Sequence, residues 1–165
     1  MIEMKVAGIA LDAITRSPIV LLKDPSDRRA LPIYIGQEQA RNIMGALEGQ
    51  KPPRPLTHDL IVSILDTWGM TLERIVIHSL QKDTFYAAFI ISQGDIKKEI
   101  DARPSDAIAV ALRTGSPIWV MEEVVAEASI PVDRDADEAE QSAFRDFVSN
   151  LRPEDLIKRY GGSTS

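Results

Sequence analysis

Short apolar runs separated by polar turns fill the first 35 residues and predict a β-rich start to the chain. Residues 3–12 and 18–23 are dominated by Val, Ile, Leu and Ala, and 31–35 forms a third run. Runs of this kind, bounded by turn residues, are typical of β-strands. Pro32 lacks a backbone N–H, which indicates an edge strand or the start of a strand. We therefore predict three strands before the first helix.

The apolar spacing then becomes helical. One stripe, at i, i+3, i+4 and i+7, consists of Ala40, Ile43, Met44 and Leu47. It predicts a helix that ends at Gly49. After a Pro-rich basic connector at 51–55, Thr57 is the predicted N-cap of a second helix, which ends at Gly69. We expect the buried face of this second helix to consist of Leu60, Ile61, Ile64, Leu65 and Trp68.

A meander and a third helix follow. The β-rich runs of the meander are 71–80, 84–92 and 96–101. Pro104 suits the first turn of a helix that ends at Gly115, and 117–121 is a last short apolar run. The predicted order is β-β-β-α-α-β-β-β-α-β. It indicates an α+β (mixed α/β) fold, with about three helices packed on one side of a mixed or mainly antiparallel sheet.

The character of the chain changes near residue 128. An acidic stretch precedes an apolar helical stripe formed by Phe144, Phe147, Val148 and Leu151. We therefore predict a domain over 1–127 and an acidic linker with an amphipathic helical tail over 128–165. We expect the stripe to dock on its own domain or on a neighbouring subunit.

Composition and charge narrow the possible functions. The 165 residues include no cysteine, which excludes disulfides, thiolate metal sites and a cysteine nucleophile. The net charge of −6 arises entirely near the C-terminus: residues 1–121 hold 14 basic and 14 acidic residues, and 122–165 hold 5 and 11. Because phosphate neutralisation drives most nucleic-acid binding, a nucleic-acid site has to be local and lie in the neutral part.

The sequence also predicts location and assembly. No run approaches the roughly 18 apolar residues of a membrane span, and no secretory signal is visible. We expect no membrane association and a cytoplasmic location, or an organelle location without the transit peptide. The runs 18–22 and 117–121 are strongly apolar for a domain with few helices to cover them. Since exposed apolar strands pair readily, we expect a homo-oligomer.

Polar side chains gather at the ends of the predicted elements. They are His58 and Asp59 at the second helix and Asp101, Arg103, Ser105 and Asp106 at the third. Two carboxylates that bracket a turn, Asp101 and Asp106, can hold Mg²⁺ or Mn²⁺, which activates water for attack on a phosphodiester. Arg103 would then grip the phosphate, and His58 would serve as general acid or base.

Structural roles account for the same residues, and the spacing alone favours them. Asp59 and Asp106 suit the dipoles at helix starts. Ser105 or Asp101 would cap the third helix, and Arg103 would pair with Asp101. Arg54 is by default a solvated cation of the connector.

Four segments together resemble the bifunctional nuclease domain family. They are 31–36, 54–60, 84–87 and 101–113, in the family's order. The resemblance implies an α/β fold, oligomeric assembly and a nuclease acting on both DNA and RNA. It places the family's recurring polar positions on His58, Asp59, Asp101, Arg103, Ser105 and Asp106. Gln39 departs from the family, which often has glutamate there, and Glu38 lies one position earlier.

The leading interpretation is a nuclease that hydrolyses phosphodiester bonds of DNA or RNA with the help of Mg²⁺ or Mn²⁺ and no organic cofactor. Its predicted catalytic residues are His58, Asp59, Asp101 and Asp106. Its predicted substrate-binding residues are Arg103, Ser105 and Arg54, and its predicted metal ligands are Asp101 and Asp106. The alternative, favoured by the acidic charge and Gln39, is a non-catalytic regulatory or ligand-binding module with the same fold. Either way, we expect Pro32, His58, Asp101 and Arg103 to share one concave region.

The acidic tail should limit access of nucleic acid, because its charge repels polyanions over a screening length of about 8–10 Å. Truncation after Ala128 should leave a folded core and raise nucleic-acid affinity or nuclease activity, most strongly at low salt. Binding of a labelled oligonucleotide across a salt series measures the effect. Loss of activity without unfolding would instead show that the tail supplies part of the site.

Overall fold

The computed structural model describes residues 1–132, which form one compact unit. The predicted stripe of Phe144, Phe147, Val148 and Leu151 lies outside the described residues. Within residues 1–132 no helix is long and apolar enough to cross a membrane.

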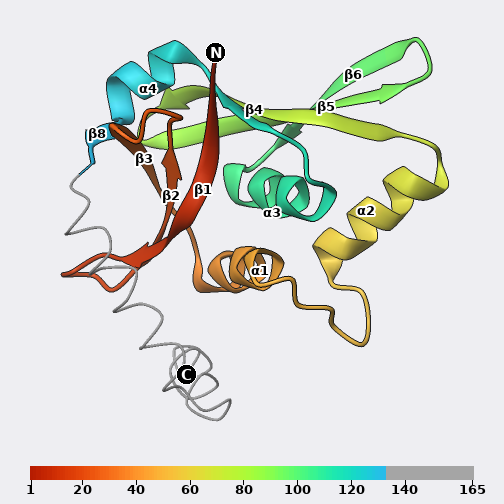
Figure 1. The fold of residues 1–165 in the computed structure, drawn as a ribbon, viewed down its shortest axis with the longest axis horizontal. Coiled ribbons are helices and arrows are strands. Elements are labelled where there is room, and N and C mark those ends of the chain that lie inside the picture. The colour runs from red at the N-terminus through yellow and green to blue at the C-terminus, as the bar shows by residue number, and fades with distance from the viewer. Residues whose placement is uncertain (133–165) are drawn as a thin grey trace. The chain divides into compact units, whose positions relative to one another are not determined.

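Eight strands and four helices make up the described part of the chain, which has the predicted α+β fold (Figure 1). The strands are β1 (Ile2–Leu11), β2 (Pro18–Lys23), β3 (Arg29–Tyr34), β4 (Thr71–Gln81), β5 (Thr84–Gln93), β6 (Ile96–Ala102), β7 (Ile118–Val120) and β8 (Ile130–Pro131). The helices are α1 (Gln37–Leu47), α2 (Thr57–Thr67), α3 (Pro104–Thr114) and α4 (Glu122–Ala128). The elements from β1 to β7 follow the predicted order, whereas the short α4 and β8 were not anticipated.

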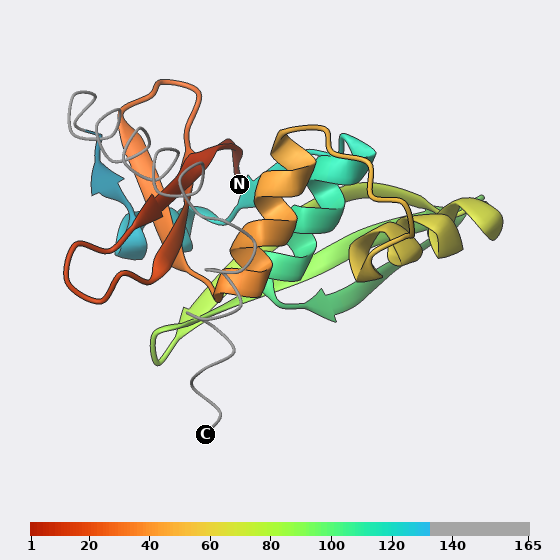
Figure 2. The ribbon, with the colours of Figure 1, turned by 90° about the horizontal axis from the view of Figure 1, so that it is seen from below.

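The described strands form one mixed sheet in the order β6-β5-β4-β7-β1-β2-β3-β8. Its β4–β7 pair is parallel, and the other neighbouring pairs are antiparallel. Figure 1 shows α1, α2 and α3 below the long ribbon of β4 and β5 and α4 above it. Figure 2 shows α1 and α3 side by side, in agreement with their extensive contacts.

Helix α3 is the buried centre of the fold. Five consecutive residues of it, from Ala107 to Ala111, are at most 1% exposed. The helix packs against α1, α2, β4 and β5, and its small alanines allow close approach on several sides at once. Gly115 ends it in the left-handed region, at φ 69°, which glycine adopts without strain. The first turn of α3 is therefore held on a rigid support.

A tight turn carries residues of β5 to the start of α3. Gln81 pairs with Thr84 across Lys82 and Asp83, whose φ angles are 50° and 63°. Two positive φ values in a two-residue turn are typical of a hairpin whose twist matches that of its strands. The turn brings Phe85, together with Asp83 and Thr84, to the lining of a pocket that Arg103 also lines.

The edge of the sheet extends beyond the predicted domain boundary. Pro32 pairs with Leu21 of β2, and β8 covers only Arg29 and Ala30 of β3, so Pro32 lies at a nearly open edge, as its missing N–H predicts. The described unit continues through β8 to Val132. A truncation that keeps this unit whole therefore begins after Val132 rather than after Ala128.

The expectation that two apolar strands lack cover within the domain is wrong. Val20, Leu22 and Val120 are fully buried, so the apolar strands 18–22 and 117–121 are covered within the same chain. Ile19 and Trp119 are only partly buried, and the homo-oligomer stays a prediction.

Helix α2 differs from its prediction in its N-cap residue and in its buried face. It begins with Thr57 as its first residue and Leu56 as its N-cap. Three residues of its predicted buried face are exposed, namely Leu60 at 50%, Ile64 at 48% and Trp68 at 68%. The helix packs mainly against α3, so one narrow side, with His58 and Leu65, is buried. The spacing identified a shared face, but no element of the described chain covers it.

This difference in burial predicts a difference in stability. Ile77 is fully buried on β4, so Ile77→Ala should lower the free energy of unfolding by about 2–5 kcal/mol through lost packing and the resulting cavity. Ile64→Ala, on the exposed side of α2, should change it by about 0.5 kcal/mol or less. Urea denaturation followed by circular dichroism measures both. Equal losses would contradict the exposure of this side of α2.

Candidate functional site

Arg103 occupies the junction between β6 and α3. It is the N-cap residue of α3, with the extended angles φ −68° and ψ 144°. The following Pro104 disfavours a helical conformation at Arg103 and starts the helix with its own fixed φ. The junction therefore presents Arg103 outward, and its side chain is 67% exposed.

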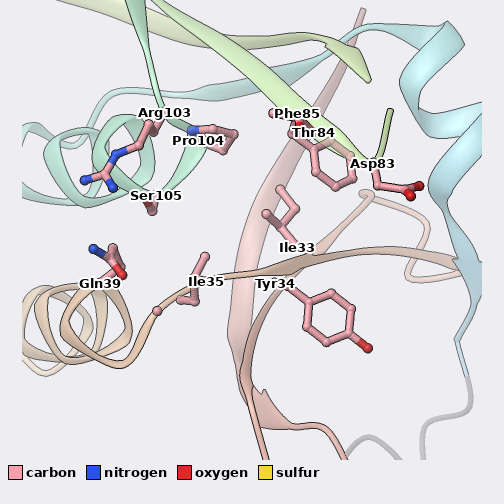
Figure 3. Close-up of a pocket in the computed structure, with 11 residues that line it drawn as sticks. Ile33, Tyr34, Ile35, Gln39, Asp83, Thr84, Phe85, Arg103, Pro104 and Ser105 are labelled. Atoms are coloured by element: carbon pink, nitrogen blue, oxygen red, sulfur yellow. The ribbon is translucent and has the colours of Figure 1, made fainter. Parts of the chain in front are cut away.

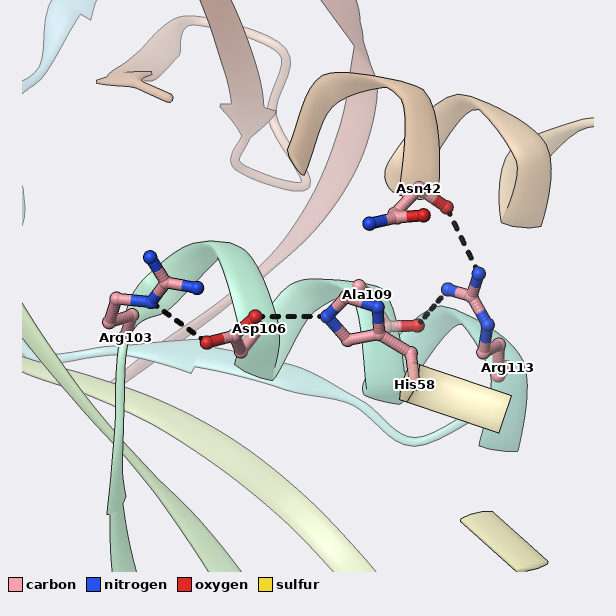
Figure 4. A network of polar contacts seen from close by, with 6 residues as sticks. All are labelled: Asn42, His58, Arg103, Asp106, Ala109 and Arg113. Atoms are coloured by element: carbon pink, nitrogen blue, oxygen red, sulfur yellow. Dashed lines mark hydrogen bonds and ion pairs between the residues drawn. The ribbon is translucent and has the colours of Figure 1, made fainter. Parts of the chain in front are cut away.

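One carboxylate connects Arg103 to a histidine from a different helix (Figure 4). The Nε of Arg103 donates to one oxygen of Asp106 at 2.9 Å. His58 Nε2 of α2 lies 2.9 Å from the other oxygen. These two bonds place His58 and Arg103 close together. Pro32, His58 and Asp101 do not line the pocket that Arg103 lines, so the concave region predicted for all four residues stays a prediction.

The charges of this group are mutually stabilised. Partial burial by itself raises the pKa of Asp106, but the hydrogen bonds from Arg103 and His58 outweigh burial and lower the pKa below its usual value. The same bond raises the pKa of Arg103. Asp106 is therefore an anion and Arg103 a cation throughout the physiological pH range.

His58 supports Asp106 from inside the protein. It is only 6% exposed, and its Nδ1 is buried without a hydrogen-bond partner in the described chain. Because a carboxylate only accepts hydrogen bonds, we assign the proton of the contact to His58 Nε2. Its remaining nitrogen faces the interior, so in this arrangement His58 positions Asp106 and does not reach a substrate.

Asp59 belongs to a second ion pair, which ties the helices together. Arg113 Nε of α3 donates to Asp59 Oδ1 at 2.9 Å, and its terminal nitrogens donate to the carbonyls of Ala109 and Asn42. Asp59 also accepts the backbone N–H of Leu56. Burial raises the pKa of Asp59, but the Leu56 and Arg113 hydrogen bonds outweigh it and lower the pKa. Arg113 was not singled out from the sequence, although a basic residue in the last turn of a helix is a recognisable signal.

The other predicted site residues do not join the Arg103–Asp106–His58 contacts. Asp101 lies on the exposed strand β6, paired in register with Ala88. Arg103 bonds Asp106 rather than Asp101, and among residues 1–132 no side-chain hydrogen bond caps α3. The predicted Asp101 pair and the Ser105 or Asp101 cap are therefore both wrong. Arg54 is exposed in the link between α1 and α2.

The described side chains do not by themselves form a metal cluster. Within residues 1–132 no group of three or more His, Cys, Asp or Glu residues could hold an ion. Both oxygens of Asp106 already accept hydrogen bonds. This donor set does not fit an ion held between Asp101 and Asp106, and the Mg²⁺ or Mn²⁺ site stays a prediction.

A pocket of about 320 Å³ adjoins Arg103 (Figure 3). Arg103 and Ser105 of the α3 start line it, with Gln39 of α1 and two aromatic residues, Tyr34 and Phe85. The N–H groups of Ser105 and Asp106 belong to the first turn, so they have no acceptor within the helix. Together with Arg103, they make this corner of the pocket suitable for an anion.

The aromatic residues of the pocket were not predicted as site residues. Tyr34 and Phe85 come from β3 and β5, which are far apart in sequence. Both lie in the segments that carry the family resemblance, which is the signal that could have identified them.

Comparison with known proteins settles the family. A sequence profile of the bifunctional nuclease domain matches residues 20–133. The chain belongs to the bifunctional nuclease domain family. The matched range contains all the site residues named above, so the resemblance noted from the sequence is confirmed.

Relatives in this family include bacterial and plant proteins. The chain is 39% identical over 162 residues to the uncharacterized protein Rv1829 of Mycobacterium tuberculosis, covering 93% of this chain and 97% of that protein. It is 29% identical over 105 residues to bifunctional nuclease 2 of Oryza sativa subsp. japonica, and this match covers 62% of this chain and 32% of that protein. It is 25% identical over 112 residues to bifunctional nuclease 1 of Oryza sativa subsp. indica, and this match covers 66% of this chain and 34% of that protein. The plant nucleases are thus about three times the length of the matched part.

The ion pairs of Asp106 predict a pH-dependent stability. Its pKa is lower in the folded protein than the value of about 3.9 in an unfolded chain. Asp106 therefore stabilises the fold above the unfolded pKa, and this contribution disappears as the pH falls through the folded pKa. At pH 7, Asp106→Asn should lower the free energy of unfolding by about 1–3 kcal/mol.

Urea denaturation between pH 7 and pH 3 tests this, and the gap between wild type and Asp106→Asn should narrow toward the acid end. Asp66→Asn is the matched control, because Asp66 is exposed on α2 and makes no side-chain hydrogen bond within the described residues. A gap that widens in acid would contradict the assigned charges.

Proposed function

We propose that the protein binds the phosphodiester backbone of DNA or RNA at the start of α3 and promotes its hydrolysis. The observation that carries the proposal is the exposed Arg103 guanidinium, held by an Asp106 that His58 supports from behind. Membership of the bifunctional nuclease domain family supports nucleic acid as the partner.

Arg103 is suited to be the phosphate-binding group. Its Nε is engaged with Asp106, and its terminal nitrogens make no hydrogen bond within the described residues. A guanidinium held on one side offers its remaining donors in a fixed direction, which lowers the entropy cost of a bidentate phosphate contact. The free N–H groups of Ser105 and Asp106 add donors at the same end.

The same donors would favour cleavage. In phosphoryl transfer, charge spreads over the non-bridging phosphate oxygens, and fixed positive groups stabilise that charge. Asp106 and His58 would act by keeping Arg103 in position. Asp59 and Arg113 would hold α2 against α3 and so maintain the His58 contact.

A second candidate function is binding without cleavage. Two observations favour it: His58 is buried with its free nitrogen facing inward, and residues 1–132 hold no ready metal cluster. In that case the family fold serves as a regulatory module that recognises a phosphate ligand.

Substitutions of Arg103 distinguish these functions. Arg103→Ala should weaken binding of a single-stranded oligonucleotide about 10- to 100-fold, as expected for a lost charged hydrogen bond. Arg103→Lys should recover part of that loss, because lysine keeps the charge but not the fork. Lys98→Ala, which removes an exposed cation from β6, is the matched control.

The same variants should be assayed for cleavage of DNA and RNA with Mg²⁺, with Mn²⁺ and with chelator. Activity that copurifies with the wild type but not with Arg103→Ala supports a nuclease, and its loss with chelator supports dependence on a divalent metal. Arg103-dependent binding with no cleavage in any condition favours the regulatory module. Binding that is unaffected by Arg103→Ala refutes both functions at this site.

A further inference from the structure

The two ends of the pocket beside Arg103 differ in chemistry. Figure 3 shows Arg103, Ser105 and Gln39 on one side of the space and Tyr34 and Phe85 on the other. The volume of about 320 Å³ is at the lower end of the range for small-molecule sites, which is roughly 300–1,000 Å³. A ligand that fills it has to be polar at one end and flat and apolar at the other.

The α3 end of the pocket offers polar groups to a ligand. Ser105 is only 8% exposed, yet its hydroxyl has no hydrogen-bond partner within residues 1–132. The hydroxyl is not sealed in the interior, and Ser105 lines the pocket, so its O–H is available as a donor to a ligand. With Arg103 beside it, this hydroxyl suits a phosphate oxygen.

The aromatic end is held in place by its surroundings. The Tyr34 hydroxyl donates to Asp12 at 2.7 Å, although the residue is 61% exposed. The N–H of Thr15 and the Tyr34 hydroxyl lower the pKa of Asp12 to about 2, so this acceptor stays charged. Phe85 is half-buried, next to the β4–β5 turn. The Tyr34 ring therefore has less freedom to lose on binding.

Charge gives the ligand a direction. Asp83 lines the aromatic side of the pocket, and Arg103 lines the other side. An anionic group is repelled at the first position and attracted at the second. A planar uncharged group fits the aromatic side, because it can stack on a ring there.

From this arrangement we infer that the pocket binds one nucleotide with its phosphate at Arg103 and Ser105 and its unstacked base against Tyr34 or Phe85. The inference rests on the proposed function and adds to it recognition of the base. A base inside a duplex is stacked and paired, and extracting it costs free energy. The protein should therefore prefer single-stranded to double-stranded nucleic acid of the same sequence.

Gln39 offers a mild way to alter the pocket. Its amide lies against Gly36 so closely that a Cβ at Gly36 would collide with it. Gly36 has φ −78°, which any residue adopts, and the colliding atom is the end of a flexible side chain. Gly36→Ala should therefore shift the Gln39 amide and change the shape of the pocket, which both residues line, without unfolding the protein.

The test compares three probes on the full-length protein by calorimetry: adenosine 5′-monophosphate, ribose 5-phosphate and inorganic phosphate. The nucleotide should bind on the order of tenfold more tightly than ribose 5-phosphate, which is the size of one base–aromatic stacking contact. Phe85→Leu and Tyr34→Leu should reduce this ratio, and Tyr34→Phe should retain it. Tyr86→Leu, on the same strand but outside the pocket, should leave it unchanged.

Each outcome separates this inference from the proposed function. Equal affinity for the nucleotide and ribose 5-phosphate overturns base recognition, as does a ratio unaffected by the Tyr34 and Phe85 variants. The proposed function survives either result if Arg103→Ala weakens binding of all three phosphate-containing probes. If Arg103→Ala weakens none, the proposed function fails, and so does the nucleotide site. Circular dichroism shows whether each variant is folded. If Phe85→Leu does not fold, Gly36→Ala still tests the site, because it should weaken binding of the nucleotide.

Discussion

The carboxylate of Asp106 is the contact on which the candidate site depends. Its two oxygens join a buried histidine on α2 to an exposed arginine at the start of α3. Each partner makes the other effective: His58 keeps Asp106 in place, and Asp106 fixes one side of the Arg103 guanidinium. A flexible surface cation becomes a directed one because the carboxylate behind it is anchored in the core. The buried helix α3 provides the support.

Most of the fold could be predicted because its elements carry their own signals. The runs of β1 to β3, the meander of β4 to β6 and the Pro104–Gly115 limits of α3 depend on local preferences and turn chemistry. Helix α4 and strand β8 are short, and strand β8 exists only through pairing with β3, which no local pattern reveals. The stripe of Leu60, Ile64 and Trp68 showed which residues share a face, but burial depends on whether another element covers that face.

The sequence predicted which residues form the candidate site better than it predicted which of them contact one another. His58, Arg103 and Asp106 stand out at helix starts, but the partner of Arg103 was not determined by proximity in sequence. Asp106 lies three residues on, in the first turn of a helix that curls back toward Arg103, whereas Asp101 lies along an extended strand. The inward orientation of His58 follows from the packing of α2 on α3. Tyr34 and Phe85 line one pocket although four strands lie between β3 and β5 in the order of the sheet, which no local pattern reveals.

That order has a mechanical consequence. Strand β7 has three residues and stands in the middle of the sheet, where it joins β6-β5-β4 to β1-β2-β3-β8 through three register pairs on each side. Phe85 belongs to one half and Tyr34 to the other. Packing of α1 on α3 and the contacts of α4 with both β4 and β3 also connect the halves, and together with this narrow seam they set the angle between them. Ile118–Val120 therefore help to set the spacing of the two rings, although none of these three residues lines the pocket.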